Sequence, residues 1–169
     1  MTARFLLAES DDAFLAGAAR RYTHFVDIPQ LPQRVWAALT SDDTLVSWSP
    51  VITAARWTSP RPFGVGTTRV VTLGRVVHLE ERFYRWEEGA QLTFTVDAAS
   101  IPGLTRFAED IALQPTPGGT RLIWTFALEG NPLLRPLLTA ASPVNHFVTR
   151  SIARGIRRAV PPTRQAAGR

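Results

Sequence analysis

The sequence predicts an α+β domain of two layers, in which an antiparallel sheet packs against a long C-terminal helix. After Pro50, apolar and polar residues alternate in short segments separated by turns rich in Gly and Pro, as in consecutive hairpins. From Leu133 onward, the apolar residues recur at helical spacing instead. The helices before Pro50 are too short to cover a sheet of this size, so the C-terminal helix is expected to lie across it.

The segment before Pro50 contains one predicted strand and two short helices. Residues 21–28 (RYTHFVDI) alternate between apolar and polar side chains. Pro32 suits the first turn of a helix. This helix has a one-sided apolar stripe, made of Val35, Trp36 and Leu39. Ser41 is a favourable N-cap for the second helix, which must end before Pro50.

Six further strands and the long helix complete the predicted domain. The strands are expected at residues 51–57, 67–73, 75–86, 91–97, 104–114 and 120–130. Asn131 and Pro132 provide a cap and a first-turn proline for the helix, and Pro143 should kink or divide it. The domain therefore spans residues 21–160. Residues 1–20 are expected to form an N-terminal extension with a weak amphipathic helix around Asp11–Arg20, and residues 161–169 are expected to form a disordered tail.

Composition excludes several classes of function. The 169 residues are 45% hydrophobic, which is enough for one domain with a substantial core, and there is no cysteine for a disulfide or a thiolate site. Three histidines at unsuitable spacing, and no nucleotide-binding or hydrolase motif, predict a protein without metal or cofactor. The N-terminus lacks a signal peptide and no apolar run is long enough to span a membrane, so a cytoplasmic location is expected.

The net charge of +5 is unevenly distributed along the chain. Residues 1–129 hold 12 arginines and 14 acidic residues, whereas residues 130–169 hold seven arginines and no acidic residue. A basic end of this kind suits an anionic partner, or it simply complements the negative end of a helix dipole. Nucleic acid is not expected, because the arginines lack interleaved aromatic residues and any DNA-binding motif. Peripheral contact with an anionic membrane through the C-terminal helix is left open.

The order of these segments resembles the START-like (SRPBCC) superfamily, in particular its polyketide cyclase/dehydrase group. The resemblance covers residues 21–160 and rests on IPQLPQRVWAALTSDDTLVSWSPVI, GVGTT, EERFYRWEEGAQLTFTV and PGGTRLIWTF, followed by the terminal helix. It implies a helix-grip fold (START/Bet v 1-like): a seven-stranded antiparallel curved sheet wrapped around the C-terminal helix, with two short helices after the first strand. The resemblance also implies a cavity between sheet and helix, with Trp36 and Trp48 in its wall.

The strand at residues 75–86 has two faces, and two interpretations of it are possible. Hydrophobicity alone turns Val77, Leu79 and Phe83 inward. The resemblance to aromatase/cyclase members implies instead that Arg82 faces the cavity. That orientation brings His78, Glu80 and Tyr84 to the cavity side. We adopt the second orientation as a prediction; if it is wrong, these polar residues form a solvated face.

Glu109 interrupts an apolar face in the strand at residues 104–114, formed by Phe107, Ile111 and Leu113. A carboxylate on such a face should pair with a cation or have a raised pKa, and Arg82 is the expected partner. On the terminal helix, Asn145 and His146 lie near the apolar stripe, and the resemblance places Asn145 on the cavity. The complete predicted ligand-binding set is Trp36, Trp48, His78, Glu80, Arg82, Tyr84, Phe107, Glu109 and Asn145.

Two classes of function fit this set. The first is binding of a hydrophobic small molecule, such as a lipid, an isoprenoid or a polyketide-like compound, by a monomer or homodimer. The alternative is a polyketide cyclase/aromatase that catalyses aldol cyclisation and dehydration. In that enzyme Arg82 would stabilise an enolate, and His78, Tyr84 or Glu109 would transfer protons. The catalytic candidates are therefore Arg82, His78 and Glu109. The sequence does not decide between enzyme and binding protein.

Overall fold

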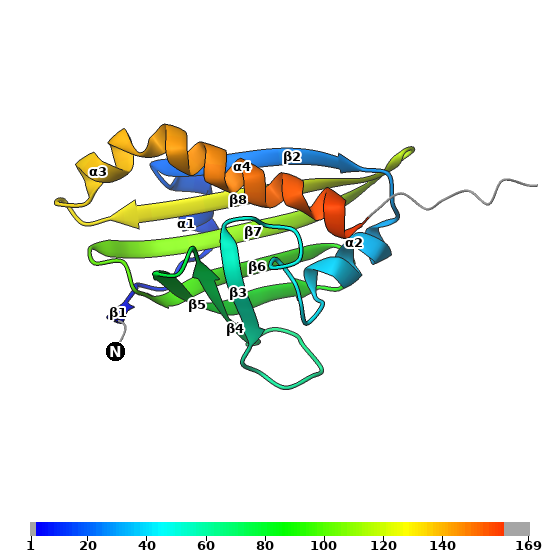
Figure 1. Cartoon of the computed structure of the whole chain (residues 1–169), viewed down its shortest axis with the longest axis horizontal. Coiled ribbons are helices and arrows are strands. Elements are labelled where there is room, and N and C mark those ends of the chain that lie inside the picture. The colour runs from blue at the N-terminus through cyan, green and yellow to red at the C-terminus, as the bar shows by residue number, and fades with distance from the viewer. Residues whose placement is uncertain (1–2, 161–169) are drawn as a thin grey trace, which may run out of the picture.

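The computed structural model describes residues 3–160, and a curved antiparallel sheet is its framework (Figure 1). The seven main strands are β2 (Arg20–Ile28), β3 (Ile52–Trp57), β4 (Thr68–Leu73), β5 (Val77–Glu87), β6 (Gln91–Ala99), β7 (Leu104–Thr116) and β8 (Gly119–Gly130). Their order in the sheet is β2-β8-β7-β6-β5-β4-β3, and a short strand β1 (Phe5–Leu6) pairs with β6. The predicted helix-grip architecture is confirmed.

The C-terminal helix crosses the concave face of this sheet in two pieces (Figure 1). Helix α3 (Arg135–Ala140) ends one residue before α4 (Ser142–Ala159) begins, as predicted from Pro143. Ala141 between them has helical backbone angles, so the two pieces nearly continue one another. The buried side of α4 consists of Thr149, Ile152, Ala153, Gly155 and Ile156. No helix within the described residues has the length and apolarity needed to cross a membrane.

The connection between β2 and β3 differs from its prediction. Helix α2 (Pro32–Leu39) forms as expected, but residues 41–48 make successive turns in place of the second helix. Leu45 in these turns has φ 66°, which interrupts any right-handed helix, and its side chain is buried. The turns end at Trp48, which packs closely against Gly155 of α4. A Cβ atom on that glycine would lie 2.7 Å from both the Cδ1 atom and the carbonyl oxygen of Trp48.

The N-terminal extension packs on the sheet face opposite α4. Helix α1 (Asp12–Gly17) lies within the predicted Asp11–Arg20 segment and is capped by the Asp11 side chain, which accepts a hydrogen bond from the Phe14 amide. Phe14 and Leu15 form a small second core with Ala108 and Ala127, from β7 and β8. The predicted disordered tail, residues 161–169, lies outside the described residues.

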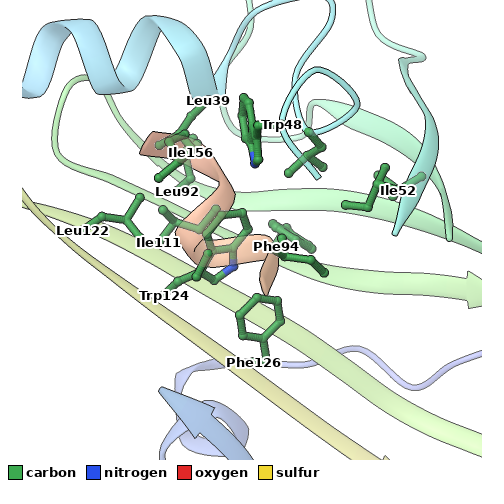
Figure 2. Packing of buried hydrophobic residues seen from close by; sticks show 14 of the residues in the cluster. Leu39, Trp48, Ile52, Leu92, Phe94, Ile111, Leu122, Trp124, Phe126 and Ile156 are labelled. Carbon is green, nitrogen blue, oxygen red and sulfur yellow. The ribbon is translucent and has the colours of Figure 1, made fainter. Parts of the chain in front are cut away.

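The main core lies between the sheet and the C-terminal half of α4. Its largest buried side chains include Trp124 and Phe126 on β8, whose rings stack at 5.4 Å. Figure 2 shows this packing from Leu39 and Ile156 to Trp124 and Phe126. Ile156 is completely buried here, so side chains fill the space at this end of the helix. The space next to the N-terminal half of α4 is not filled in the same way.

Candidate ligand-binding site

A cavity of about 180 Å³ lies between the sheet, α3 and the N-terminal half of α4. This volume is slightly larger than the roughly 150 Å³ of an apolar protein cavity that holds one benzene molecule. Its apolar lining residues are Leu45, Ile52, Val71, Leu73, Val77, Leu79, Ile101, Leu104, Phe107, Trp124, Phe126, Leu128, Leu138, Val148 and Ile152. Five polar residues complete the wall: Arg69, Glu81, Glu109, Asn145 and Thr149. The composition is that of a site for an apolar molecule with few polar groups.

The lining residues differ in exposure from one end of the cavity to the other. Arg69, Glu81, Glu109 and Trp124 are buried and mark its closed end. Half-buried residues gather at α3, at the start of α4 and in the loop after β6. They include Leu138, Asn145, Val148 and Ile101. The accessible end of the cavity therefore lies beside α3.

The closed end contains a buried ion pair between neighbouring strands. Arg69 on β4 and Glu81 on β5 are directly opposite in the sheet register. The Arg69 Nε atom donates a hydrogen bond of 2.7 Å to Glu81 Oε2, and both side chains are almost completely buried. The guanidinium also lies 5.0–5.4 Å from the ring centres of Trp57, Phe83 and Phe94. Charge-assisted hydrogen bonds and aromatic faces together stabilise this cation in an apolar environment.

Glu109 is the second carboxyl group at this end, and no arginine within residues 3–160 forms an ion pair with it. The indole Nε1 of Trp124 donates a hydrogen bond of 2.7 Å to Glu109 Oε2. Burial and the nearby charge of Glu81 raise the pKa of Glu109 to about 8, against the smaller effects of Trp124 and Arg69. Burial also raises the pKa of Glu81, although Arg69 opposes that shift. One guanidinium serves two buried carboxyl groups, so Glu109 is the group that holds a proton near neutral pH.

Two polar side chains reach the cavity from α4. Thr149 Oγ1 lies 2.8 Å from His24 Nε2 and donates to the Asn145 carbonyl oxygen at 2.9 Å. Burial is the main cause that lowers the pKa of His24 to about 4, so this histidine is neutral. Because the Thr149 hydroxyl donates its proton to the Asn145 carbonyl oxygen, it accepts from the Nε2 tautomer of His24. The Asn145 side-chain amide forms no hydrogen bond with any other described residue. It is therefore free to bond a ligand.

The predicted orientation of β5 is wrong. Val77, Leu79 and Glu81 face the cavity, whereas Arg82 lies on the opposite face. Arg82 does not pair with Glu109: its Nε donates to Asp97 at 2.8 Å and its Nη2 to Glu9 at 3.1 Å. The other three residues expected on the cavity side are also outside it.

Each of these three residues has a partner on the outer face or on the N-terminal extension. Glu80 pairs with Arg4 at 2.7 Å, and the Tyr84 hydroxyl donates to Asp12 at 3.2 Å. His78 Nδ1 lies 3.1 Å from the Thr72 hydroxyl. The physical reason for the reversed orientation is twofold. Turning the apolar face of β5 inward buries more hydrophobic surface, and the extension supplies countercharges for the polar face.

Trp36 and Trp48 are buried, but neither lines the cavity, so the predicted wall is also corrected here. The Trp36 ring packs edge-on against Trp86 at 5.6 Å, and Trp48 lies against α4. Leu45 and Ile52, from the same part of the chain, reach the cavity instead.

Phe107, Glu109 and Asn145 are the predicted site residues that lie on the cavity wall, and their role in binding stays a prediction. Sequence reasoning missed Arg69 and Glu81. The alternation of residues 67–73, which places Arg69 on one face with Val71 and Leu73, could have revealed the first. Glu81 could have been found from the apolar face of β5, which it shares with Val77 and Leu79.

A cavity held between a curved antiparallel sheet and a C-terminal helix defines a helix-grip protein. Residues 19–160 match the family described as "Polyketide cyclase / dehydrase and lipid transport", and the chain belongs to this family. An uncharacterised protein of Mycobacterium tuberculosis (strain ATCC 25618 / H37Rv) is 34% identical over 146 residues, covering 86% of this chain and 87% of that protein. An uncharacterised protein of Mycobacterium bovis matches to the same extent.

Solved structures show the same fold at low sequence identity. A crystal structure from Thermus thermophilus has a TM-score of 0.69 at 18% identity and covers 83% of this chain and 96% of that one. A START superfamily protein from Mycobacterium smegmatis has a TM-score of 0.61 at 13% identity with the same coverages. The structure of Ara h 8.0201 has a TM-score of 0.57 at 15% identity and covers 79% of this chain and 94% of that one. Family and fold together suggest a hydrophobic ligand.

Proposed function

We propose that this protein binds a neutral hydrophobic molecule in the cavity, with one hydrogen-bond acceptor of the ligand directed at Glu109. The observation that carries the proposal is the contrast between fifteen apolar lining residues and five polar ones, three of which form a cluster at the closed end. A lipid, an isoprenoid or a polyketide-like compound has the matching chemistry if it carries a carbonyl or hydroxyl oxygen on a short apolar segment, because a cavity of about 180 Å³ encloses only a segment of that size.

The charge state of the cluster favours a neutral ligand over an anionic one. The Arg69 guanidinium is already neutralised by Glu81 through short hydrogen bonds. A ligand carboxylate would therefore meet the negative charge of Glu81 without a free cation to balance it. Glu109 Oε2 accepts from Trp124, and no described residue bonds to its Oε1, so the protonated carboxyl can donate from there.

A cyclase/aromatase remains a second candidate because Glu109 is a carboxyl group with a pKa of about 8, as a general acid requires. Two of the three catalytic candidates, Arg82 and His78, lie outside the cavity, and Arg69 is engaged by Glu81. An enzyme of this kind would thus depend on Glu109 alone for proton transfer. Binding without chemistry is the function that this arrangement supports better.

Nuclear magnetic resonance with 1-octanol as the probe tests the proposal. We expect saturable movement of the Trp124 indole N–H resonance, which the variant Trp124→Phe assigns, because this group bonds Glu109 at the closed end. The Trp57 indole N–H, which donates to the Ser41 carbonyl oxygen and does not line the cavity, serves as the internal control. Equal shifts of both resonances, or no shift of Trp124, would contradict ligand binding in this cavity.

A cytoplasmic location and a monomeric or homodimeric state belong to the same proposal. Cell fractionation and analytical ultracentrifugation are the respective tests.

A further inference from the structure

The outer side of the C-terminal helices exposes a row of apolar residues. Leu133, Leu137, Val144 and Phe147 are 89%, 63%, 62% and 72% exposed, respectively. The spacing of seven and three residues keeps Leu137, Val144 and Phe147 on one side, because α3 and α4 nearly continue one another, and Leu133 lies in the turn that leads into α3. Exposed apolar residues in a contiguous group are typical of a docking surface.

The same side of α4 becomes strongly basic towards its C-terminal end. Arg150, Arg154, Arg157 and Arg158 are exposed, and none of them forms an ion pair within residues 3–160. A shallow hollow on this surface is lined by Phe147 and three of these arginines, together with Ser151 and Gly155. Four exposed arginines elsewhere in residues 3–160 have carboxylate partners, namely Arg4, Arg61, Arg121 and Arg135, and the four on α4 differ from the other unpaired ones by lying together on one helix. The free guanidinium groups therefore suit an anionic partner from outside the chain.

We propose that the outer face of α3 and α4 docks on an anionic lipid surface, with the four apolar side chains inserted and the four arginines contacting lipid phosphates. An apolar row joined to a basic row is the pattern of helices that lie in a membrane interface. The accessible end of the cavity lies beside α3, so docking brings it close to the lipid. The exchange of a ligand between lipid and cavity rests on the proposed function, whereas the docking itself does not.

Two other partners fit the surface less well. A nucleic acid would engage the arginines, but its phosphates would leave the exposed aliphatic side chains of α3 in water. A second copy of this chain, related by a twofold axis across the middle of the face, would place the arginines of one copy against the apolar residues of the other, and a twofold axis along the helix would bring two sets of unpaired arginines together. A lipid surface satisfies both halves of the face at once.

Vesicle flotation with the whole chain is the first test. We compare vesicles of phosphatidylcholine alone with vesicles that also contain phosphatidylglycerol. The protein should float with the anionic vesicles, and added salt should release much of it, because screening weakens the arginine contacts. Equal flotation with both vesicle types, or flotation with neither, overturns the proposal.

Matched variants identify the surface. Arg154→Gln/Arg158→Gln should weaken binding to anionic vesicles by roughly 25-fold, since each basic residue near such a surface contributes about fivefold. Leu137→Ser/Phe147→Ser should also weaken binding, while circular-dichroism melts stay close to the parent because both side chains are exposed. The controls are Arg56→Gln and Phe25→Ser, which are exposed residues of the same types on β3 and β2. Losses no larger than those of the controls overturn the assignment.

Three further measurements separate the alternatives. Tighter binding to a single-stranded oligonucleotide than to anionic vesicles, sensitive only to the arginine substitutions, would assign the face to nucleic acid. A dimer in sedimentation that Leu137→Ser/Phe147→Ser dissociates would assign it to a second copy. Either result overturns lipid docking. If 1-octanol leaves Trp124 unchanged while vesicle binding behaves as expected, the docking surface stands and the ligand-binding proposal fails.

Discussion

Glu109 and Glu81 are carboxyl groups at one end of the same cavity, and their surroundings differ by a single guanidinium. Glu81 has Arg69 as a direct partner, whereas Glu109 has the indole of Trp124. A neutral donor compensates little of the cost of burying a charge, so Glu109 retains its proton and Glu81 retains its ion pair. This difference makes the two side chains experimentally separable.

The first prediction concerns the pH dependence of stability. The pKa of Glu109 is raised from 4.5 to about 8 in the folded state, so the folded protein binds more protons than the unfolded chain between these values. The contribution of Glu109 is therefore fully present below pH 4.5 and is lost as the pH rises through 8. Glu109→Gln, a neutral isostere, should remove this decline, which amounts to a few kcal/mol at about 1.4 kcal/mol per pKa unit.

Urea unfolding at pH 5, 7 and 8.5 measures this effect. The difference between parent and Glu109→Gln should favour the variant increasingly as the pH rises. Glu88→Gln, at an exposed position of the β5–β6 turn, controls for the loss of a carboxyl group. A constant difference across the three pH values would show that Glu109 titrates normally.

The second prediction compares two arginines on opposite faces of the sheet. Arg69→Met should cost roughly 3–5 kcal/mol of unfolding free energy, because it leaves Glu81 buried without its partner. Arg82→Met removes ion pairs of a guanidinium that is 33% exposed, and should cost about 1 kcal/mol or less. Denaturant melts of both variants at pH 7 provide the comparison, and equal losses would contradict the assigned orientation of β5.

At the scale of elements, the contact between α4 and the turns at residues 41–48 determines how closely the helix approaches the sheet. Gly155 allows this approach, since any Cβ atom there would collide with the backbone and ring of Trp48. The helix is thereby held down at its C-terminal end, while the cavity stays open near its N-terminal end. The close packing at the C-terminal end of α4 and the cavity near its N-terminal end therefore result from the same placement of the helix.

The third prediction tests this contact. Gly155→Ala should lower the unfolding free energy by about 1–3 kcal/mol, because backbone atoms of Trp48 must shift to admit the methyl group. Gly17→Ala, in a helix where a Cβ atom meets nothing within 4 Å, should cause no loss. Thermal melts compare the two variants. A Gly155→Ala variant as stable as the parent would mean that α4 and the turns at residues 41–48 do not pack this closely.

The strands themselves were predictable from alternation, and each lies within a few residues of its expected range. The orientation of β5 was not predicted, although its apolar residues indicated the correct side. The resemblance through Arg82 was followed instead, and nothing local to β5 revealed that Glu9 and Asp97 would pair with that arginine. Such partners come from elsewhere in the chain, so a strand considered alone does not show them.

At the scale of the whole molecule, the order of the segments was sufficient to predict the helix-grip fold. The second short helix was wrong because Leu45 adopts a left-handed conformation that its residue type gives no reason to expect. The role of the N-terminal extension was also missed. Helix α1 packs on the outer face of the sheet, where Phe14 and Leu15 are buried, and β1 pairs with β6, so both elements depend on long-range contacts.

The fourth prediction concerns the cavity as the ligand-binding site, and native mass spectrometry after incubation with a total lipid extract tests it most directly. Val148 lines the cavity, while Val144, one helical turn away, is exposed, so Val148→Phe fills the space and Val144→Phe is its matched control. We predict that the parent and Val144→Phe carry a bound small molecule and that Val148→Phe carries none. A parent without any bound molecule, or a Val148→Phe variant that retains as much as the control, would contradict the account.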